Sequence, residues 1–339
     1  MRPLPLEERL FQGAVSLEYG DGWVKPWRLP VHELSLFPPD GIGGKAEIPA
    51  GVRIRFASDT RAVSLGVVPS DQPLEVDCVI DGGPPRTAVL PAGGERLDFQ
   101  ELPPGEKTIE LYLSQKVPMR LTALHIDSGA AFQIPRDPRP RWIAYGSSIT
   151  QCAGAASPAR TWPALVARRH GLRLTCLGYG GNCHLEPMVA RMIRDLPADL
   201  ISLCVGINVY GAASLSPRTF RPAVIGFIQI LRERHVETPI IVQSPICSPP
   251  REEQPNAVGF TLAAIRAEVE GAVATLRERG DARLFYVNGL EVFGADCVAH
   301  LPDQLHPDAV GYEIMAENYS RAVWESGRIE GLPAAAPGG

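Results

Sequence analysis

The second half of the chain alternates short apolar runs with amphipathic stretches, and this alternation constrains the fold more than any other feature. We expect strands at residues 142–146, 172–177, 199–205, 239–244 and 283–287. We expect helices at about 160–170, 185–195, 219–235, 256–279 and 308–325. Strands that alternate with helices predict an α/β domain with a mainly parallel sheet and right-handed crossovers.

The fourth of these helices has the clearest pattern. Apolar residues recur with helical spacing at Val258, Leu262, Ile265, Val269, Ala272 and Leu276. Pro255 suits the first turn of a helix, and Gly280 is a typical stop signal.

Residues 1 to about 128 have a different pattern, with no convincing helical period. Short β-branched or alternating runs occur at 52–56, 62–67, 74–80, 108–113 and 120–124. Turn sequences rich in proline and glycine separate them, which predicts an all-β sandwich domain. The aromatic and proline-rich segment 21–30 is interpreted as a packed irregular loop; the alternative is a rim that faces a sugar or an acyl group.

The domain boundaries follow from these patterns. We expect a β-sandwich domain over 1–128, an α/β domain over 142–328 and a flexible tail over 329–339. Residues 129–141 are rich in proline and arginine, which predicts a stiff linker that its arginines keep exposed.

Composition excludes several classes of function. A net charge of −5 provides no basic footprint for nucleic acid. No uncharged apolar run approaches the length that spans a membrane, and the N-terminus lacks the apolar core of a signal peptide. The seven cysteines are scattered, as expected of reduced thiols in a cytoplasmic protein. No sequence feature specifies an oligomeric state.

Four groups of small and polar residues follow the predicted strands. They are Gly146-Ser147-Ser148-Ile149-Thr150, the run from Gly178 to Asn182, Gly206-Ile207-Asn208, and Asp303 with His306. Open α/β sheets bind ligands at the carboxyl ends of their strands, so we expect all four groups at one edge of the sheet.

These residue types suit acyl chemistry. A serine hydroxyl becomes a good nucleophile when a base takes its proton, and we assign these roles to Ser148 and His306. Asp303 would hold the imidazole in the correct tautomer and stabilise its charged form. The tetrahedral oxyanion needs donors fixed in advance, for which we assign the backbone N–H groups of Ser148 and Gly181 and the side-chain amide of Asn208.

Each group has a more ordinary interpretation when taken alone. His306 precedes Pro307 and an apolar helix, as a capping or surface histidine would. The glycines are a weak match to a phosphate-binding loop, because neither a P-loop nor a G-x-G-x-x-G completes them. A zinc site could be drawn from Cys183, His184, His300 and His306. Their spacing matches no structural zinc pattern, so we expect neither a metal nor a cofactor. The G-x-S-x-G nucleophile elbow is also absent, because Thr150 replaces its last glycine.

The four groups, in this order, resemble the four blocks of the SGNH/GDSL hydrolase superfamily. The resemblance covers about residues 141–325 and implies a five-stranded parallel sheet in flavodoxin-like order. It also implies a catalytic triad of Ser148, Asp303 and His306. Ser147 and Val209 depart from the aspartates that the family has at these positions. The Gly-Ser-Ser-Ile-Thr variant is similar to a branch that includes an acyltransferase of tetracycline-type biosynthesis, with a carbohydrate-module-like N-terminal domain.

The sequence is compatible with three functions. The first is a serine esterase that cleaves a small O-acyl ester through an acyl-enzyme. The second is an acyltransferase that moves the acyl group to a hydroxyl of a polyketide or glycosylated natural product. The third is an inactive glycan-binding protein, which the complete set of Ser148, Asn208, Asp303 and His306 disfavours. We expect small-molecule partners, and neither nucleic acid nor membrane.

Overall fold

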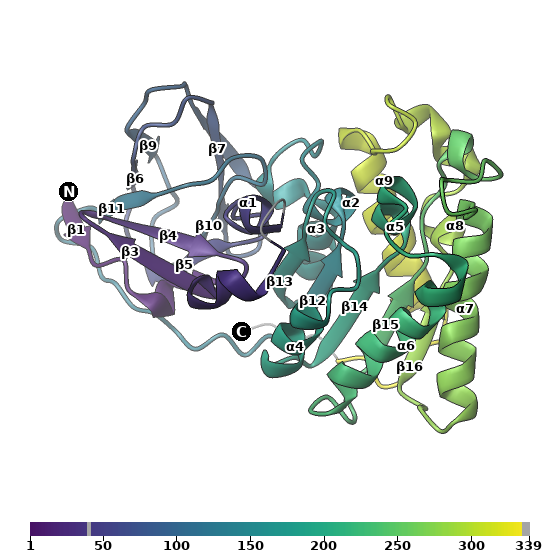
Figure 1. Cartoon of the computed structure of the whole chain (residues 1–339). Coiled ribbons are helices and arrows are strands. Elements are labelled where there is room, and N and C mark those ends of the chain that lie inside the picture. The colour runs from purple at the N-terminus through teal and green to yellow at the C-terminus, as the bar shows by residue number, and fades with distance from the viewer. Residues whose placement is uncertain (39–41, 334–339) are drawn as a thin grey trace.

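The computed structural model describes residues 1–38 and 42–333. Figure 1 shows two parts side by side: antiparallel sheets built from the N-terminal residues, and a parallel sheet flanked by helices. The predicted fold class is therefore confirmed. No helix among the described residues is long and apolar enough to cross a bilayer.

The parallel sheet contains all five strands predicted from the alternating pattern. They are β12 (Arg141–Gly146), β13 (Arg173–Gly178), β14 (Leu200–Cys204), β15 (Ile240–Gln243) and β16 (Leu284–Val287). Their order is β13-β12-β14-β15-β16, and every neighbouring pair is parallel. This is the flavodoxin-like order, which places a switch point at the carboxyl end of β12.

Helices cover both faces of the sheet (Figure 1). They are α2 (Ser148–Gln151), α3 (Trp162–Arg169), α4 (Pro187–Asp195), α5 (Ile207–Ala212), α6 (Pro217–Arg232), α7 (Leu262–Glu278), α8 (Gly289–Val292) and α9 (Ala309–Ser320). Short turns of helix lie at η3 (Pro158–Arg160), η4 (Pro249–Arg251), η5 (Ala295–His300) and η6 (Arg321–Glu325). Helix α3 packs on α9, whereas α6 packs on α4 and α7.

The helix expected over 256–279 begins later than its apolar pattern suggests. Helix α7 starts at Leu262, after Thr261 caps it by accepting a hydrogen bond from the Ala264 N–H at 3.0 Å. Gly259 has φ of +83°, which a continuing helix cannot contain. Val258 is exposed and belongs to the preceding loop.

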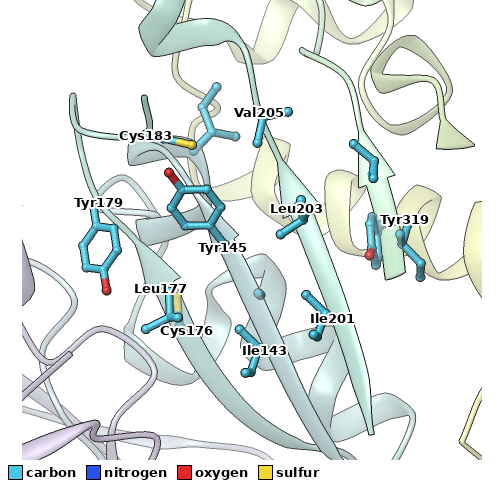
Figure 2. Packing of buried hydrophobic residues seen from close by; sticks show 14 of the residues in the cluster. Ile143, Tyr145, Cys176, Leu177, Tyr179, Cys183, Ile201, Leu203, Val205 and Tyr319 are labelled. Carbon is cyan, nitrogen blue, oxygen red and sulfur yellow. The ribbon is translucent and has the colours of Figure 1, made fainter. Parts of the chain in front are cut away.

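Both faces of the parallel sheet are buried. Figure 2 shows Ile143, Ile201 and Leu203 packed between strands and helices, and each is at most 1% exposed. Tyr145 stacks on Phe227 with ring centroids 5.2 Å apart. Covering by helices on both faces explains why these strands are continuous apolar runs in the sequence.

The N-terminal residues form two antiparallel sheets around a separate apolar core. The first has the order β3-β4-β11-β6-β9, with β1 paired to β11, and the second has the order β2-β5-β10-β7-β8. Their strands are β1 (Arg2–Leu4), β2 (Phe11–Gln12), β3 (Ser16–Gly20), β4 (Trp23–Trp27), β5 (Arg53–Ser58), β6 (Val63–Val67), β7 (Leu74–Ile80), β8 (Arg86–Leu90), β9 (Arg96–Phe99), β10 (Lys107–Tyr112) and β11 (Leu121–Ile126). They include every run that the sequence predicted.

The aromatic segment expected to be an irregular loop is instead a strand. Strand β4 pairs along its length with β3, and with β11 only at Val24. Pro26 has no backbone N–H to donate to a neighbouring strand, and it is tolerated here because β4 is scarcely paired on its β11 side. Trp27 is 7% exposed, and its Nε1 donates to Glu18 at 2.8 Å. Because the segment belongs to a sheet, the irregular-loop interpretation was wrong.

The segment after β4 packs on the α/β layer. It contains the short helices η2 (Val31–Leu36) and α1 (Ile42–Ala46). Its buried side chains belong to the same apolar cluster as the parallel sheet, namely Leu29, Phe37, Ile42 and Ala46, and Trp27 at the end of β4 joins them. This part of the N-terminal half is therefore integral to the core of the second half.

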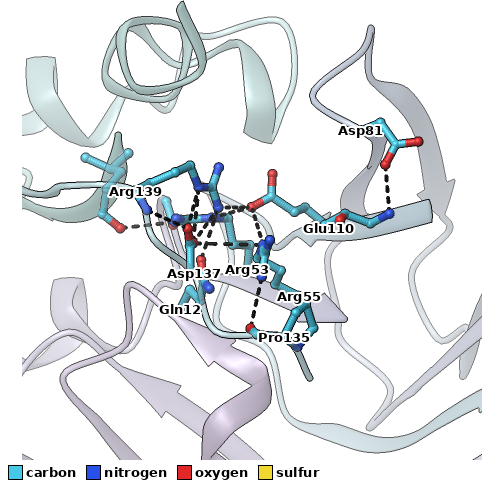
Figure 3. Close-up of polar contacts among 11 residues, drawn as sticks. Gln12, Arg53, Arg55, Asp81, Glu110, Pro135, Asp137 and Arg139 are labelled. Carbon is cyan, nitrogen blue, oxygen red and sulfur yellow. Dashed lines mark hydrogen bonds and ion pairs between the residues drawn. The ribbon is translucent and has the colours of Figure 1, made fainter. Parts of the chain in front are cut away.

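An ionic network joins the two halves near the predicted linker (Figure 3). Arg139 Nη2 donates to Glu110 at 2.5 Å and to Asp137 at 2.7 Å. Arg53 Nη1 donates to the Leu174 carbonyl of β13 at 3.0 Å. Burial alone would raise the pKa of Asp137, but hydrogen bonds from Arg139 and the charge of Arg55 hold it well below its usual range. The expectation of exposed linker arginines therefore fails for Arg139, whose side chain is 20% exposed.

The flexible tail predicted over 329–339 lies partly outside the described residues, which end at 333. Within the described part, Ile329 and Leu332 pack against the core of the α/β layer. The domain boundaries proposed from the sequence stay a prediction.

Candidate active site

The candidate nucleophile lies where β12 passes into α2. Strand β12 ends at Gly146, and a Cβ there would lie 2.1 Å from Thr150 Oγ1, so the turn requires glycine. Ser147 is 2% exposed and caps α2 by accepting a hydrogen bond from the Ile149 N–H at 3.2 Å. Ser148 is the first residue of α2 and is only half-buried. Of the two serines, Ser148 is therefore the one open to a substrate.

His306 and Asp303 lie beside this serine. Ser148 Oγ is 2.8 Å from His306 Nε2, and His306 Nδ1 is 2.6 Å from Asp303 Oδ2. The His306 backbone N–H also donates to Asp303 Oδ1 at 2.7 Å. An ionised carboxylate can only accept, so Nδ1 carries the proton and Nε2 is free to accept from the serine.

A strained turn holds this pair. Gln304, between the aspartate and the histidine, has φ of +60°, which non-glycine residues rarely adopt. Its carbonyl accepts hydrogen bonds from Ser248 Oγ at 2.7 Å and from Arg251 Nη1 at 3.3 Å. Backbone strain of this kind persists where surrounding contacts fix it, and it is common at functional sites.

The electrostatics favour an ionised aspartate. Burial alone would raise the pKa of Asp303, but hydrogen bonds from the His306 side chain and from the backbone N–H groups of His306 and Leu305 lower it to about 2. The site is nevertheless open to solvent, because the side chains of His306 and Asp303 are 38% and 54% exposed.

Residues 178–183, from the last residue of β13 onward, lie between Ser148 and Asn208, and we call them the glycine loop. A Cβ built on Gly180 would lie 3.5 Å from Ser148 Cβ. At the other end of the loop, the Cys183 N–H donates to Asn208 Oδ1 at 3.0 Å. This bond fixes the amide of Asn208 and leaves its Nδ2 available to donate elsewhere.

Gly181, in the same loop, is exposed and has φ of +74°. Among the described residues, its N–H donates no hydrogen bond. Its carbonyl is 2.9 Å from His184 Nε2, and His184 Nδ1 is in turn 2.8 Å from Ser214 Oγ. The carbonyl of Gly181 is therefore occupied by His184, and its N–H stays available to a ligand.

Three residues to which the sequence assigned no role in acyl chemistry hold the glycine loop in place. Gln151 Oε1 accepts a hydrogen bond from the Gly180 N–H at 3.0 Å. Arg28 Nη1 donates to the carbonyls of Cys176 and Gly178 at 3.2 and 2.5 Å. His184 is the third, because its ring joins the Gly181 carbonyl to Ser214. Only His184 carried a sequence signal, as a candidate for zinc, and Arg28 lies too far along the chain for any local motif to reveal.

The residues considered for zinc do not converge. Cys183 is buried, and His300 pairs with Asp308 at 3.3 Å. Over residues 1–38 and 42–333, no cluster of three or more His, Cys, Asp or Glu side chains has the geometry to hold a metal ion.

Comparison with known proteins identifies the family of the chain. The profile of the GDSL-like lipase/acylhydrolase family matches residues 140–324, which is more than half of the chain. The chain belongs to the GDSL-like lipase/acylhydrolase family. A second profile, described as the N-terminal domain of SsfX3, matches residues 10–117. No curated protein sequence matches the chain.

Several solved structures resemble the fold of this chain. A salicylyl-acyltransferase, SsfX3, from a tetracycline biosynthetic pathway is 37% identical over 96% of this chain and 98% of its own, with a TM-score of 0.89. A protein from Bacteroides ovatus, described by its similarity as a GDSL-like lipase, is 23% identical over 98% of this chain and 99% of its own, with a TM-score of 0.77. A family two carbohydrate esterase from Clostridium thermocellum is 14% identical over 92% and 99%, with a TM-score of 0.63. The last two show likeness of fold alone.

The two departures from the GDSL-like pattern have structural explanations. Ser147 replaces an aspartate but still caps α2 with its side-chain oxygen. Val209 is fully buried beside Asn208, in α5. Neither residue takes part in the chain of contacts from Ser148 to Asp303, so the departures leave that chain intact.

Proposed function

We propose that the protein is a serine esterase that cleaves a small O-acyl ester through an acyl-enzyme on Ser148. The observation that carries this proposal is the continuous chain from Ser148 Oγ to His306 Nε2, and from His306 Nδ1 to Asp303 Oδ2, at 2.8 and 2.6 Å. Hydrogen-bonded contact between nucleophile and base, with the base oriented by a third group, is the requirement for this chemistry.

In the first step, Ser148 Oγ attacks the ester carbonyl while its proton moves to His306 Nε2. The carbonyl oxygen becomes an oxyanion, for which we assign the N–H groups of Ser148 and Gly181 and the Asn208 amide as donors. The intermediate then collapses, the ester C–O bond breaks, and the alcohol leaves with the proton from His306. Asp303 stabilises the charged imidazole throughout this step without taking its proton.

In the second step, a nucleophile discharges the acyl-enzyme. His306 takes a proton from water, the resulting hydroxyl attacks the acyl carbon, and a carboxylic acid leaves as Ser148 regains its proton. The exposure of His306 and Asp303, 38% and 54%, allows water to reach this position and supports hydrolysis.

Acyl transfer to an alcohol is the second candidate, in which a hydroxyl replaces water in the second step. It is favoured by the 37% identity to a protein described as a salicylyl-acyltransferase, along nearly the full length of both chains. The acceptor would then be a hydroxylated polyketide or a glycosylated natural product.

The shared intermediate can be tested directly. The protein is mixed with 4-nitrophenyl acetate, quenched in acid, digested and mapped by mass spectrometry. We expect an acetyl group on the peptide that carries Ser148, and its absence in S148A. Full turnover of the ester by S148A would contradict the proposal for both hydrolysis and transfer.

A further inference from the structure

A lysine from the N-terminal half of the chain lies beside the candidate nucleophile. Lys45 belongs to α1 and is half-buried. A Cβ built on Gly180 would lie 3.8 Å from Lys45 Cε and 3.5 Å from Ser148 Cβ. The missing side chain of Gly180 therefore leaves a space that Lys45 and Ser148 both border.

The position of Lys45 is fixed by a buried arginine. Arg28 is fully buried, and its Nη2 donates to the Lys45 carbonyl while its Nη1 donates to the Gly178 carbonyl. One guanidinium thus ties α1 to the glycine loop. On either side of Lys45, Ile42 and Ala46 are buried in the core of the α/β layer. The backbone of Lys45 is therefore held rigidly against the site.

The ammonium group of Lys45 differs from those of the other lysines in its surroundings. Within the described residues, no carboxylate lies within 4.0 Å of it, and no hydrogen-bond acceptor contacts it. The other three lysines have such partners: Glu47 for Lys25, Glu75 for Lys116, and the Gly105 carbonyl for Lys107. A partly buried cation beside a reaction site is stabilised when a ligand supplies the opposite charge.

We propose that Lys45 is a specificity-determining residue that binds an anionic group, a carboxylate or an equivalent acid, on the substrate of the Ser148 site. This inference rests on the proposed function, because it names the class of substrate for the same site. The anion is carried on the acyl group or on the alcohol, a few bonds from the ester. Residues from both halves of the chain then determine which ester is bound.

Such a contact has a distinct kinetic signature. The substrate carboxylate lies a few bonds from the ester that reacts. Its attraction to the Lys45 ammonium is therefore the same for the bound substrate and for the transition state. It therefore lowers KM for acidic esters and leaves kcat unchanged, while neutral esters are unaffected. A purely structural role of Lys45 would change both classes of ester together.

The test measures binding in the S148A protein, where no turnover through Ser148 interferes. Two matched pairs of esters are titrated by calorimetry. One pair is mono-4-nitrophenyl succinate and its methyl ester, which places the acid on the acyl group. The other pair is 4-acetoxybenzoate and its methyl ester, which places the acid on the alcohol. We expect the acid of at least one pair to bind about 10-fold more tightly than its methyl ester, as for a hydrogen bond to a charged group.

The preference should depend on the charge of Lys45. In the S148A protein, K45M should abolish the preference for the acids without changing the affinity for the methyl esters. K45R in the same protein should retain most of the preference. K116M removes a lysine that pairs with Glu75 at 3.0 Å and serves as the matched control, which should keep the preference. The pair that responds identifies whether the acyl group or the alcohol carries the anion.

Two results would overturn the inference. One is the absence of any preference for the acids in either pair. The other is an equal loss of affinity for acids and methyl esters in K45M, which would indicate a structural role. Failure of the proposed function has a separate sign, which is undiminished ester turnover in S148A with Lys45 intact.

Discussion

Arg28 donates a hydrogen bond from Nη1 to the carbonyl of Gly178, 2.5 Å away and 150 residues further along the chain. The guanidinium is fully buried, has no carboxylate partner among the described residues, and also donates to the Ile48 carbonyl at 2.6 Å. Burial lowers the pKa of Arg28 from its usual value. Backbone carbonyls from both halves of the chain therefore replace the water that this cation would otherwise bind.

Replacing Arg28 should destabilise the protein and displace the glycine loop. We expect R28M to lower the free energy of unfolding by at least about 3 kcal/mol, because it leaves several buried carbonyls without donors. Urea denaturation at neutral pH measures this loss. R96M is the matched control, because Arg96 is exposed and pairs with the exposed Asp98, and it should change the stability little. Equal stability of R28M and the wild type would show that Arg28 does not join the two halves.

Ser148 and Ser147 should respond differently to the same substitution. A fluorophosphonate probe should label the wild type and S147A, and it should fail to label S148A, because only Ser148 contacts His306. S147A removes the cap of α2 and should cost about 1 kcal/mol of stability. Peptide mapping of the labelled protein, together with thermal denaturation, separates the two effects. A label found on Ser147 would refute the assignment.

Asn208 has two roles that substitutions can separate. Its Oδ1 accepts from the Cys183 N–H, and we propose that its Nδ2 donates to the oxyanion. N208A should lower kcat by about 10²–10³-fold with folding intact. N208D keeps an acceptor for Cys183 but removes the donor, so it should be at least as impaired as N208A. A rate near that of the wild type in N208D would mean that the two backbone donors suffice.

Local sequence patterns predicted the parallel sheet and placed the candidate site at its edge. The sequence that follows β12 is rich in serine and threonine, and it predicted the position of the candidate nucleophile. It could do so because a few adjacent residues determine both the end of the strand and the cap of α2. The same holds for Asp303 and His306, which one turn of chain brings together.

The contribution of the N-terminal half could not be predicted in the same way. Helix α1 has five residues, two of them glycine, so it has no helical period to detect. Arginines are rarely fully buried, so nothing in the sequence distinguished Arg28 from a surface residue. The partners of Arg28 in β13, and the place of Lys45 beside Gly180, are long-range and depend on how the two halves pack.

Acid should weaken the junction between the two halves. Folding lowers the pKa of the Asp137 carboxyl. The ionised carboxylate therefore stabilises the folded protein at any pH above its pKa in the unfolded chain, which is about 3.9. This stabilisation is lost as the pH falls through the lower pKa of the folded state. We expect the free energy of unfolding to fall as the pH drops below about 4. D137N should reduce stability at pH 7 by about 3–5 kcal/mol, because it removes one of the two carboxylates that the partly buried Arg55 and Arg139 contact, and should flatten the acid dependence. D98N, an exposed control, should retain the wild-type dependence; an unchanged dependence in D137N would contradict this account.

The lifetime of the acyl-enzyme should distinguish hydrolysis from transfer. Water at its bulk concentration reaches an open site, and His306 and Asp303 are both exposed, so we expect the acyl group on Ser148 to be discharged rapidly in buffer alone. Transfer would instead require that water be excluded and that an alcohol be held against the acyl carbon.

The measurement forms the acyl-enzyme with 4-nitrophenyl acetate, removes excess ester by rapid gel filtration, and follows the mass of the acylated protein with time. Parallel samples contain a hydroxylated polycyclic compound or a sugar as acceptor. Rapid decay that neither acceptor accelerates would support the esterase. An acyl-enzyme that survives in buffer and is discharged only by an acceptor would establish transfer, in keeping with the acyltransferase to which this chain is 37% identical.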